Sequence, residues 1–73
     1  MPKTIYSKEY SRLVKKLKAA RKVSGLNQTQ VGKLLKKDQT FVSKVEAGQY
    51  RLDAIQLAQF ARIYKKDIKH FLS

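Results

Sequence analysis

The chain has 73 residues, a length that allows one domain and excludes a second. Its 17 Lys and Arg outweigh 5 Asp and Glu to give a formal net charge of +12, which favours nucleic acid, an anionic membrane or an acidic protein as partner. The absence of cysteine excludes a disulfide framework and a thiolate metal site. No apolar run approaches the roughly 18 residues of a membrane span, and the amino terminus lacks the apolar stretch of a signal peptide. We therefore expect a cytoplasmic protein. Binding to a membrane surface is not expected either, because each amphipathic helix face is needed for the core of so small a domain.

The first expected helix lies between a Ser7 cap and a Gly25 stop. Its apolar residues recur at i, i+3, i+4 and i+7, and they are Tyr10, Leu13, Val14, Leu17 and Ala20. Residues 1–6 precede this helix and are expected to form a flexible arm of the single domain 1–73.

Four polar residues mark the starts of further helices: Asn27, Asp38, Asp53 and Asp67. Apolar residues follow at helical spacing, and they are Val31, Leu34 and Leu35, then Val42 and Val45, then Leu57, Phe60, Ala61 and Tyr64, and last Ile68, Phe71 and Leu72. The run 40–42 also has strand propensity, but no other segment shows the alternating pattern of a partner strand, so a helix is favoured. The pattern predicts an all-α protein with five helices.

The segment 28–47, QTQVGKLLKKDQTFVSKVEA, resembles the helix-turn-helix of the Cro/C1-type (XRE) transcriptional regulators. The resemblance extends over residues 13–72 and implies a compact, lambda-repressor-like DNA-binding domain. It makes Gly32 the small residue where the two motif helices meet, and it gives the buried positions to Val31, Leu35, Val42 and Val45. In many relatives, an Arg at the position of Arg21 pairs with a Glu at the position of Glu46, so we predict an ion pair between them.

Two residues depart from the family pattern. Lys36 stands where relatives usually have the turn glycine, and Lys37 where they usually have a buried aliphatic residue. A left-handed Lys costs about 1 kcal/mol, and the stem of a Lys can cover apolar surface while its ammonium stays in water. The turn either accommodates the two residues in this way or has another shape.

The resemblance places the helix 39–47 in the major groove. Its positions outside the core are the candidate base-reading residues Gln39, Thr40, Ser43 and Lys44. Gln39 could bond to adenine N6 and N7, and Lys44 to guanine O6 and N7, whereas Thr40 suits a thymine methyl or a phosphate. The alternative is an ordinary solvated helix face. Phe41 is expected to pack against the fourth helix, the alternative being contact with a base methyl or a sugar.

The candidate phosphate ligands surround this helix, and they are Gln28, Lys33, Lys37, Tyr50 and Arg51. Gln28 also begins a helix, whose free amides and dipole favour anions. For Tyr50 and Arg51 the alternative is a plain surface turn.

Nothing in the sequence points to catalysis. Three of the five acids are expected helix caps, Glu46 is assigned to the ion pair and Glu9 lies in a first turn. His70 has no Cys or acidic neighbours at ligand spacing, and no glycine-rich phosphate loop is present. We expect no metal, no cofactor and no enzymatic activity.

One such domain covers a half-site of about 4 to 5 base pairs, so a homodimer on a palindromic operator is expected. Leu52, Ile55 and Ile63 are the candidate dimer interface, the alternative being that they cover the edge of the core. The expected function is that of a repressor or autoregulator of transcription. It could be a phage-like repressor, a controller protein of a restriction–modification system or an antitoxin, and the sequence does not choose among them. Two other functions stay open: a module that binds chiefly an acidic protein such as a toxin, and a nonspecific RNA-binding or nucleoid-like protein.

Overall fold

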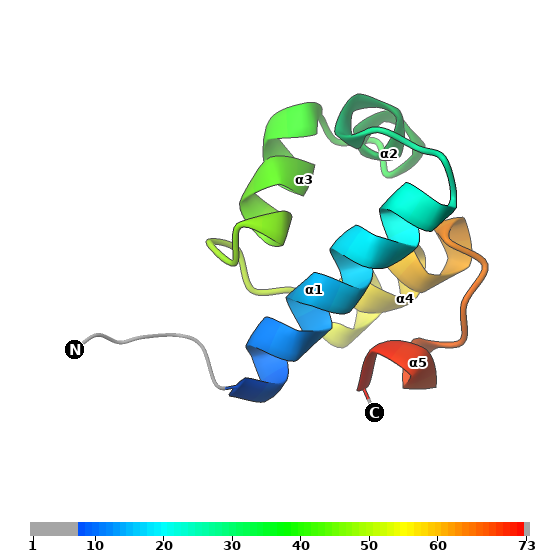
Figure 1. Ribbon diagram of the computed structural model, residues 1–73. Coiled ribbons are helices and arrows are strands. Elements are labelled where there is room, and N and C mark those ends of the chain that lie inside the picture. The colour runs from blue at the N-terminus through cyan, green and yellow to red at the C-terminus, as the bar shows by residue number, and fades with distance from the viewer. Residues whose placement is uncertain (1–7, 73) are drawn as a thin grey trace.

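The computed structural model describes residues 8–72, and all regular secondary structure in that range is helical. The helices are α1 (Lys8–Val23), α2 (Gln28–Leu34), α3 (Gln39–Glu46), α4 (Ala54–Ile63) and α5 (Ile68–Leu72) (Figure 1). The expected all-α fold with five helices is confirmed, including helix rather than strand at 40–42. The expected arm at 1–6 and the Ser7 cap lie outside the described residues. None of the described helices is both long and apolar enough to cross a membrane.

The ends of the helices follow from local sequence signals. Asn27, Asp38 and Asp53 each accept a hydrogen bond through Oδ1 from the backbone amide three residues further on, which has no acceptor within the helix. The distances are 2.8 Å from Gln30, 2.9 Å from Phe41 and 2.7 Å from Gln56. Gly25 and Gly48 follow α1 and α3 with φ of +74° and +78°.

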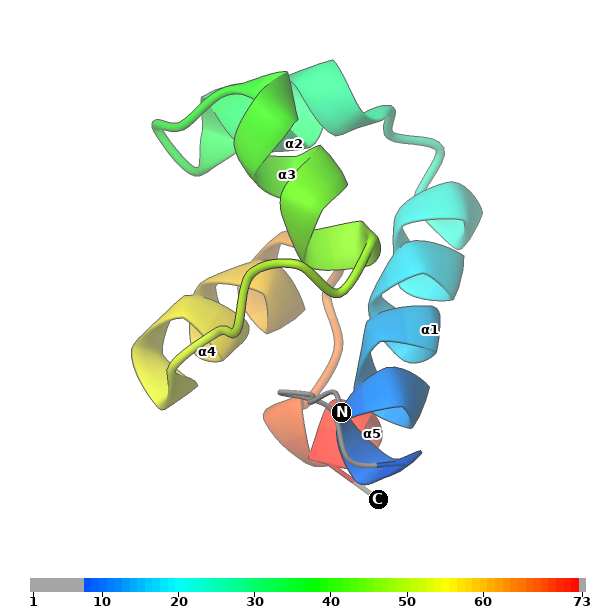
Figure 2. The same cartoon turned by 90° about the vertical axis from the view of Figure 1, so that its left-hand side faces the viewer.

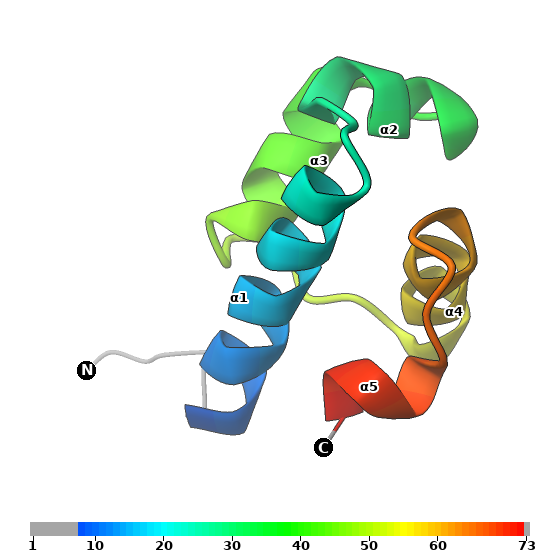
Figure 3. The same ribbon diagram turned by 45° about the vertical axis from the view of Figure 1, so that its right-hand side comes forward.

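Helix α1 is the longest of the described helices and contacts both α3 and α5 (Figures 1 and 2). Helix α2 packs on α3 at one end of the domain, whereas α5 packs on α4 and on α1 at the other end (Figure 3). The apolar face predicted for α1 is buried throughout. The core between the helices consists of Tyr10, Leu13, Val14, Leu17, Ala20, Val31, Val42, Val45, Leu57, Phe60, Ala61, Tyr64 and Phe71.

Two expected core residues lie on the surface. Leu34 is 59% exposed and Leu72 is 65% exposed. At about 100° per residue, position 35 falls closer than position 34 to the direction of buried Val31, and Leu35 is the residue that packs against the core. Phe71 is buried, and Leu72 follows it by one residue and therefore points about 100° away.

The turn between α2 and α3 accommodates the two unusual lysines. Lys36 adopts the left-handed conformation with φ of +59°, and the Lys37 amide donates to the carbonyl of Gly32 at 2.8 Å. A Cβ added to Gly32 would lie 2.6 Å from both the carbonyl carbon and the oxygen of Asp38. The two helices of the motif therefore approach so closely that only glycine fits at their contact.

Candidate nucleic-acid interface

Helix α3 presents an outer face that no other described helix covers (Figure 2). Val42 and Val45 are fully buried, and their packing sets the rotation of the helix about its axis. The candidate base-reading residues consequently face outward: Gln39, Thr40 and Lys44 are exposed, and Ser43 is half-buried.

An ion pair joins the end of α3 to α1. Arg21 Nε lies 2.7 Å from Glu46 Oε2, and Arg21 Nη2 donates to Glu46 Oε1 at 3.2 Å. The two side chains are only 12% and 4% exposed, and the hydrogen bond to Glu46 raises the pKa of Arg21. Arg21 Nη1 also donates to the carbonyl of Leu26 at 3.0 Å, so the guanidinium links α1, α3 and the segment before α2.

The polar contacts continue from this ion pair to the surface. Gln28 Nε2 donates to Glu46 Oε1 at 3.0 Å, and Gln28 Oε1 accepts from Gln39 Nε2 at 2.8 Å. One hydrogen of the Gln39 amide and its carbonyl oxygen then stay available. These are the donor and the acceptor that the N7 and N6 edge of adenine requires. The sequence singled out both glutamines but not the bond between them.

Cationic and amide groups lie beside this face. Lys33 and Lys37 are exposed, and Lys37 Nζ lies 5.6 Å from the ring centroid of Phe41. The capping box of α2 uses the amides of Asn27 and Gln30, whereas the amides at the first two helical positions have no acceptor within the helix. The Gln28 side chain is half-buried and already bonded on both sides, so one amide hydrogen remains for a phosphate.

Phe41 is half-buried and packs against α4, as expected. Its ring lies edge-on to the Tyr50 ring, with 5.0 Å between the ring centroids. It is stacked with the Phe60 ring of α4, with 6.3 Å between the centroids. The Tyr50 hydroxyl accepts from Gln56 Nε2 at 3.2 Å. Tyr50 is therefore anchored at both ends of its side chain while it remains 38% exposed.

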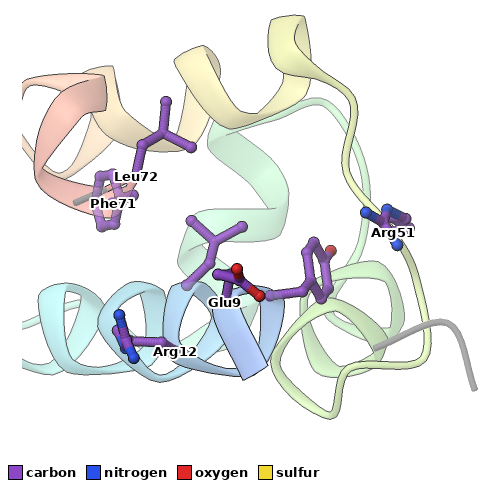
Figure 4. Close-up of a pocket in the computed structure, with 7 residues that line it drawn as sticks. Glu9, Arg12, Arg51, Phe71 and Leu72 are labelled. Atoms are coloured by element: carbon purple, nitrogen blue, oxygen red, sulfur yellow. The ribbon is translucent and has the colours of Figure 1, made fainter. Parts of the chain in front are cut away.

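Arg51 lies on the segment that leads into α4, beside a hollow formed with α1 and α5 (Figure 4). Its guanidinium carbon is 5.0 Å from the ring centroid of Tyr10. The Tyr10 hydroxyl donates to the Tyr50 carbonyl at 3.1 Å and accepts from the Leu52 amide at 3.0 Å. Sequence reasoning missed this contact, and the only signal was a tyrosine at one position of an otherwise apolar helix face.

The three candidate dimer residues do not form one patch. Ile55 is 71% exposed in the first turn of α4, whereas Leu52 and Ile63 are half-buried and pack against the core. Ile63 lies at the far end of the same helix, about 12 Å along its axis from Ile55. Among the three, Ile55 offers the exposed apolar surface.

Residues 8–72 contain no cluster of three His, Asp or Glu side chains that could hold a metal ion. The region is a polar and basic surface around α3, on which Gln39 is linked through Gln28 to the ion pair of Arg21 and Glu46. Such a surface can bind DNA through base edges and phosphates.

Residues 17–71 match the sequence pattern of the helix-turn-helix family. A solved structure described as an XRE-family like protein from Pseudomonas syringae pv. tomato str. DC3000 superposes with a TM-score of 0.83. Its sequence is 34% identical, and the match covers 89% of this chain and 79% of that chain. No match is found among curated protein sequences.

The fold and the outward-facing second helix of the motif define a helix-turn-helix DNA-binding domain. The chain belongs to the Cro/C1-type (XRE) family of helix-turn-helix proteins. This family consists of DNA-binding regulators and not of enzymes.

Proposed function

We propose that the chain is a sequence-specific regulator of transcription, a repressor or autoregulator, that binds a palindromic operator as a homodimer. The observation that carries the proposal is the bonding of Gln39 to Gln28, and of Gln28 to buried Glu46. A glutamine on an ordinary solvated helix face has no such support. Here the amide is oriented before DNA arrives, which lowers the entropic cost of a base contact.

In the proposed complex, the helix 39–47 lies in the major groove. Gln39 bonds to adenine and Lys44 donates to guanine, and each such contact discriminates between bases by about 1 to 3 kcal/mol. Thr40 and Ser43 add hydroxyl contacts at the edge of the groove.

The proposed phosphate ligands come from α2, from the turn that follows it and from the segment before α4. They are Gln28, Lys33, Lys37, Tyr50 and Arg51. Phosphate contacts set the register and orientation of a protein on DNA without reading the sequence. Substitution of a base-reading residue should therefore lower the preference for one sequence, whereas substitution of a phosphate ligand should lower the affinity for all sequences.

The test is a binding selection from random duplex DNA at about 150 mM salt with excess nonspecific competitor, conditions that suppress binding by charge alone. We expect a palindrome with half-site centres about one helical turn apart. Gln39→Ala and Lys44→Ala should then lower the preference for this site over random DNA, whereas Arg51→Ala should weaken binding to both alike. Equal loss of preference in all three variants would contradict the assignment.

Dimer formation is proposed to use Ile55, whose side chain is the exposed member of the candidate interface. Ile55→Glu should give a folded monomer in sedimentation experiments, whereas Ala19→Glu, which adds the same charge at an exposed position of α1, should leave the dimer intact. An unchanged dimer in the Ile55 variant would remove this interface. If the selection yields no motif, the alternative function gains support, in which an acidic protein such as a toxin is the main partner.

A further inference from the structure

The segment between α3 and α4 has no helix or strand of its own. It carries two proposed phosphate ligands, Tyr50 and Arg51. Tyr50 and Leu52 make no backbone–backbone hydrogen bond with any described residue. The conformation of this segment therefore depends on contacts from side chains.

The Tyr10 hydroxyl supplies the missing contacts. It bonds to the Tyr50 carbonyl and to the Leu52 amide at 3.1 and 3.0 Å, so it ties down the backbone on both sides of Arg51. The Tyr10 ring is 7% exposed and belongs to the core, which gives the hydroxyl a rigid support. The same ring lies 5.0 Å from the Arg51 guanidinium, within the range of a cation–π contact.

We propose that Tyr10 is a positioning residue for DNA binding, which fixes the segment 50–52 and presents Arg51 to a phosphate. This inference rests on the proposed function, in which Arg51 binds the DNA backbone. Because Tyr10 orders the segment in the free protein, the ordering cost does not reduce the binding free energy.

Tyr10→Phe tests the proposal because it keeps the ring and removes only the hydroxyl. We expect a folded protein whose affinity for duplex DNA falls about three- to tenfold, the effect of ordering the loop during binding instead of before it. The loss should be equal for the selected site and for random duplex, since no base-reading residue changes. The slope of log K against log salt concentration should stay unchanged in Tyr10→Phe, because Arg51 still reaches the phosphate once the segment is ordered, whereas Arg51→Ala should make it shallower by about one.

A double-mutant cycle with Arg51→Ala separates positioning from a general structural role. In the Arg51→Ala background, Tyr10→Phe should change the affinity by less than about twofold, because the group that it positions is gone. Tyr64→Phe, which also removes a buried tyrosine hydroxyl but one that bonds to no described residue, is the matched control and should leave the affinity unchanged.

Equal losses from Tyr10→Phe in both backgrounds would overturn the inference. Binding of Arg51→Ala that equals the wild type would overturn it too, because no phosphate contact would need positioning. The cycle uses random duplex DNA of defined length at low salt, so it can be read even if the selection yields no operator. Failure of the proposed function and failure of this inference are thus distinguishable.

Discussion

Replacing Glu46 with alanine tests the buried ion pair that supports the candidate DNA-binding face. The substitution removes the acceptor of three hydrogen bonds, two from Arg21 and one from Gln28. Arg21 keeps a single bond, to the carbonyl of Leu26, and its side chain is 12% exposed. A charge with so little exposed surface recovers only part of its hydration while the domain stays folded.

The expected loss follows from this geometry. Removing one partner of a buried ion pair costs about 3 to 5 kcal/mol, and the remaining bond of Arg21 places this case near the lower limit. A domain of this length has a free energy of unfolding of about 4 to 11 kcal/mol. A loss of about 3 kcal/mol would lower the Tm by about 12 to 24 °C.

Urea unfolding with linear extrapolation measures this loss, and the thermal midpoint provides a second measure. The double variant Arg21→Met with Glu46→Leu is the informative comparison, since it leaves no uncompensated charge and should be more stable than Glu46→Ala. A loss below about 1 kcal/mol for Glu46→Ala would refute the reasoning, because that is the contribution of an exposed pair. A double variant as unstable as the sum of its single changes would refute it as well.

Three further substitutions examine the turn and the core. Gly32→Ala should lower the free energy of unfolding by about 1 to 3 kcal/mol, because the new methyl group would lie 2.6 Å from the backbone of Asp38. Lys36→Gly should raise it by about 0.5 to 1 kcal/mol, since φ is +59° at this position. Tyr64→Phe should leave stability near neutral pH unchanged or higher, because the buried Tyr64 hydroxyl has no hydrogen-bond partner among residues 8–72. Burial raises the pKa of that hydroxyl, so the wild type should lose stability as the pH rises above about 10, and the variant should lose less. Urea titrations at neutral and alkaline pH measure all of these effects.

Each of these predictions has a matched control. Gly25→Ala introduces strain at a φ of +74° but meets no atom within 4 Å, so its cost should stay near 1 kcal/mol and below that of Gly32→Ala. Lys66→Gly changes a lysine with negative φ and should destabilise rather than stabilise. Tyr50→Phe removes an exposed hydroxyl and should leave the alkaline loss of stability as it is in the wild type. If a control variant changed the free energy of unfolding in the way expected of the substitution that it is paired with, the argument for that substitution would be contradicted.

The helices and their starts could be predicted from the sequence because their signals are local. A cap side chain reaches an amide three residues away, and an apolar face repeats every three or four residues. The family resemblance added what local signals lack, namely the contact between Arg21 and Glu46, which are 25 residues apart. It also indicated which face of the helix 39–47 turns outward.

Tertiary packing decided the rest. The exposure of Leu34 depends on how far α2 is rotated against its neighbours, a rotation that a helix of seven residues does not encode by itself. The Tyr10 hydroxyl meets backbone groups 40 and 42 residues away, a contact set by how α1 packs beside the segment before α4. The sequence alone determined which residues form helices and which face of each is apolar, because these depend on neighbours within one turn. Only the packing of the helices decided which polar atoms meet, because hydrogen bonds require distances near 3 Å that no residue spacing specifies.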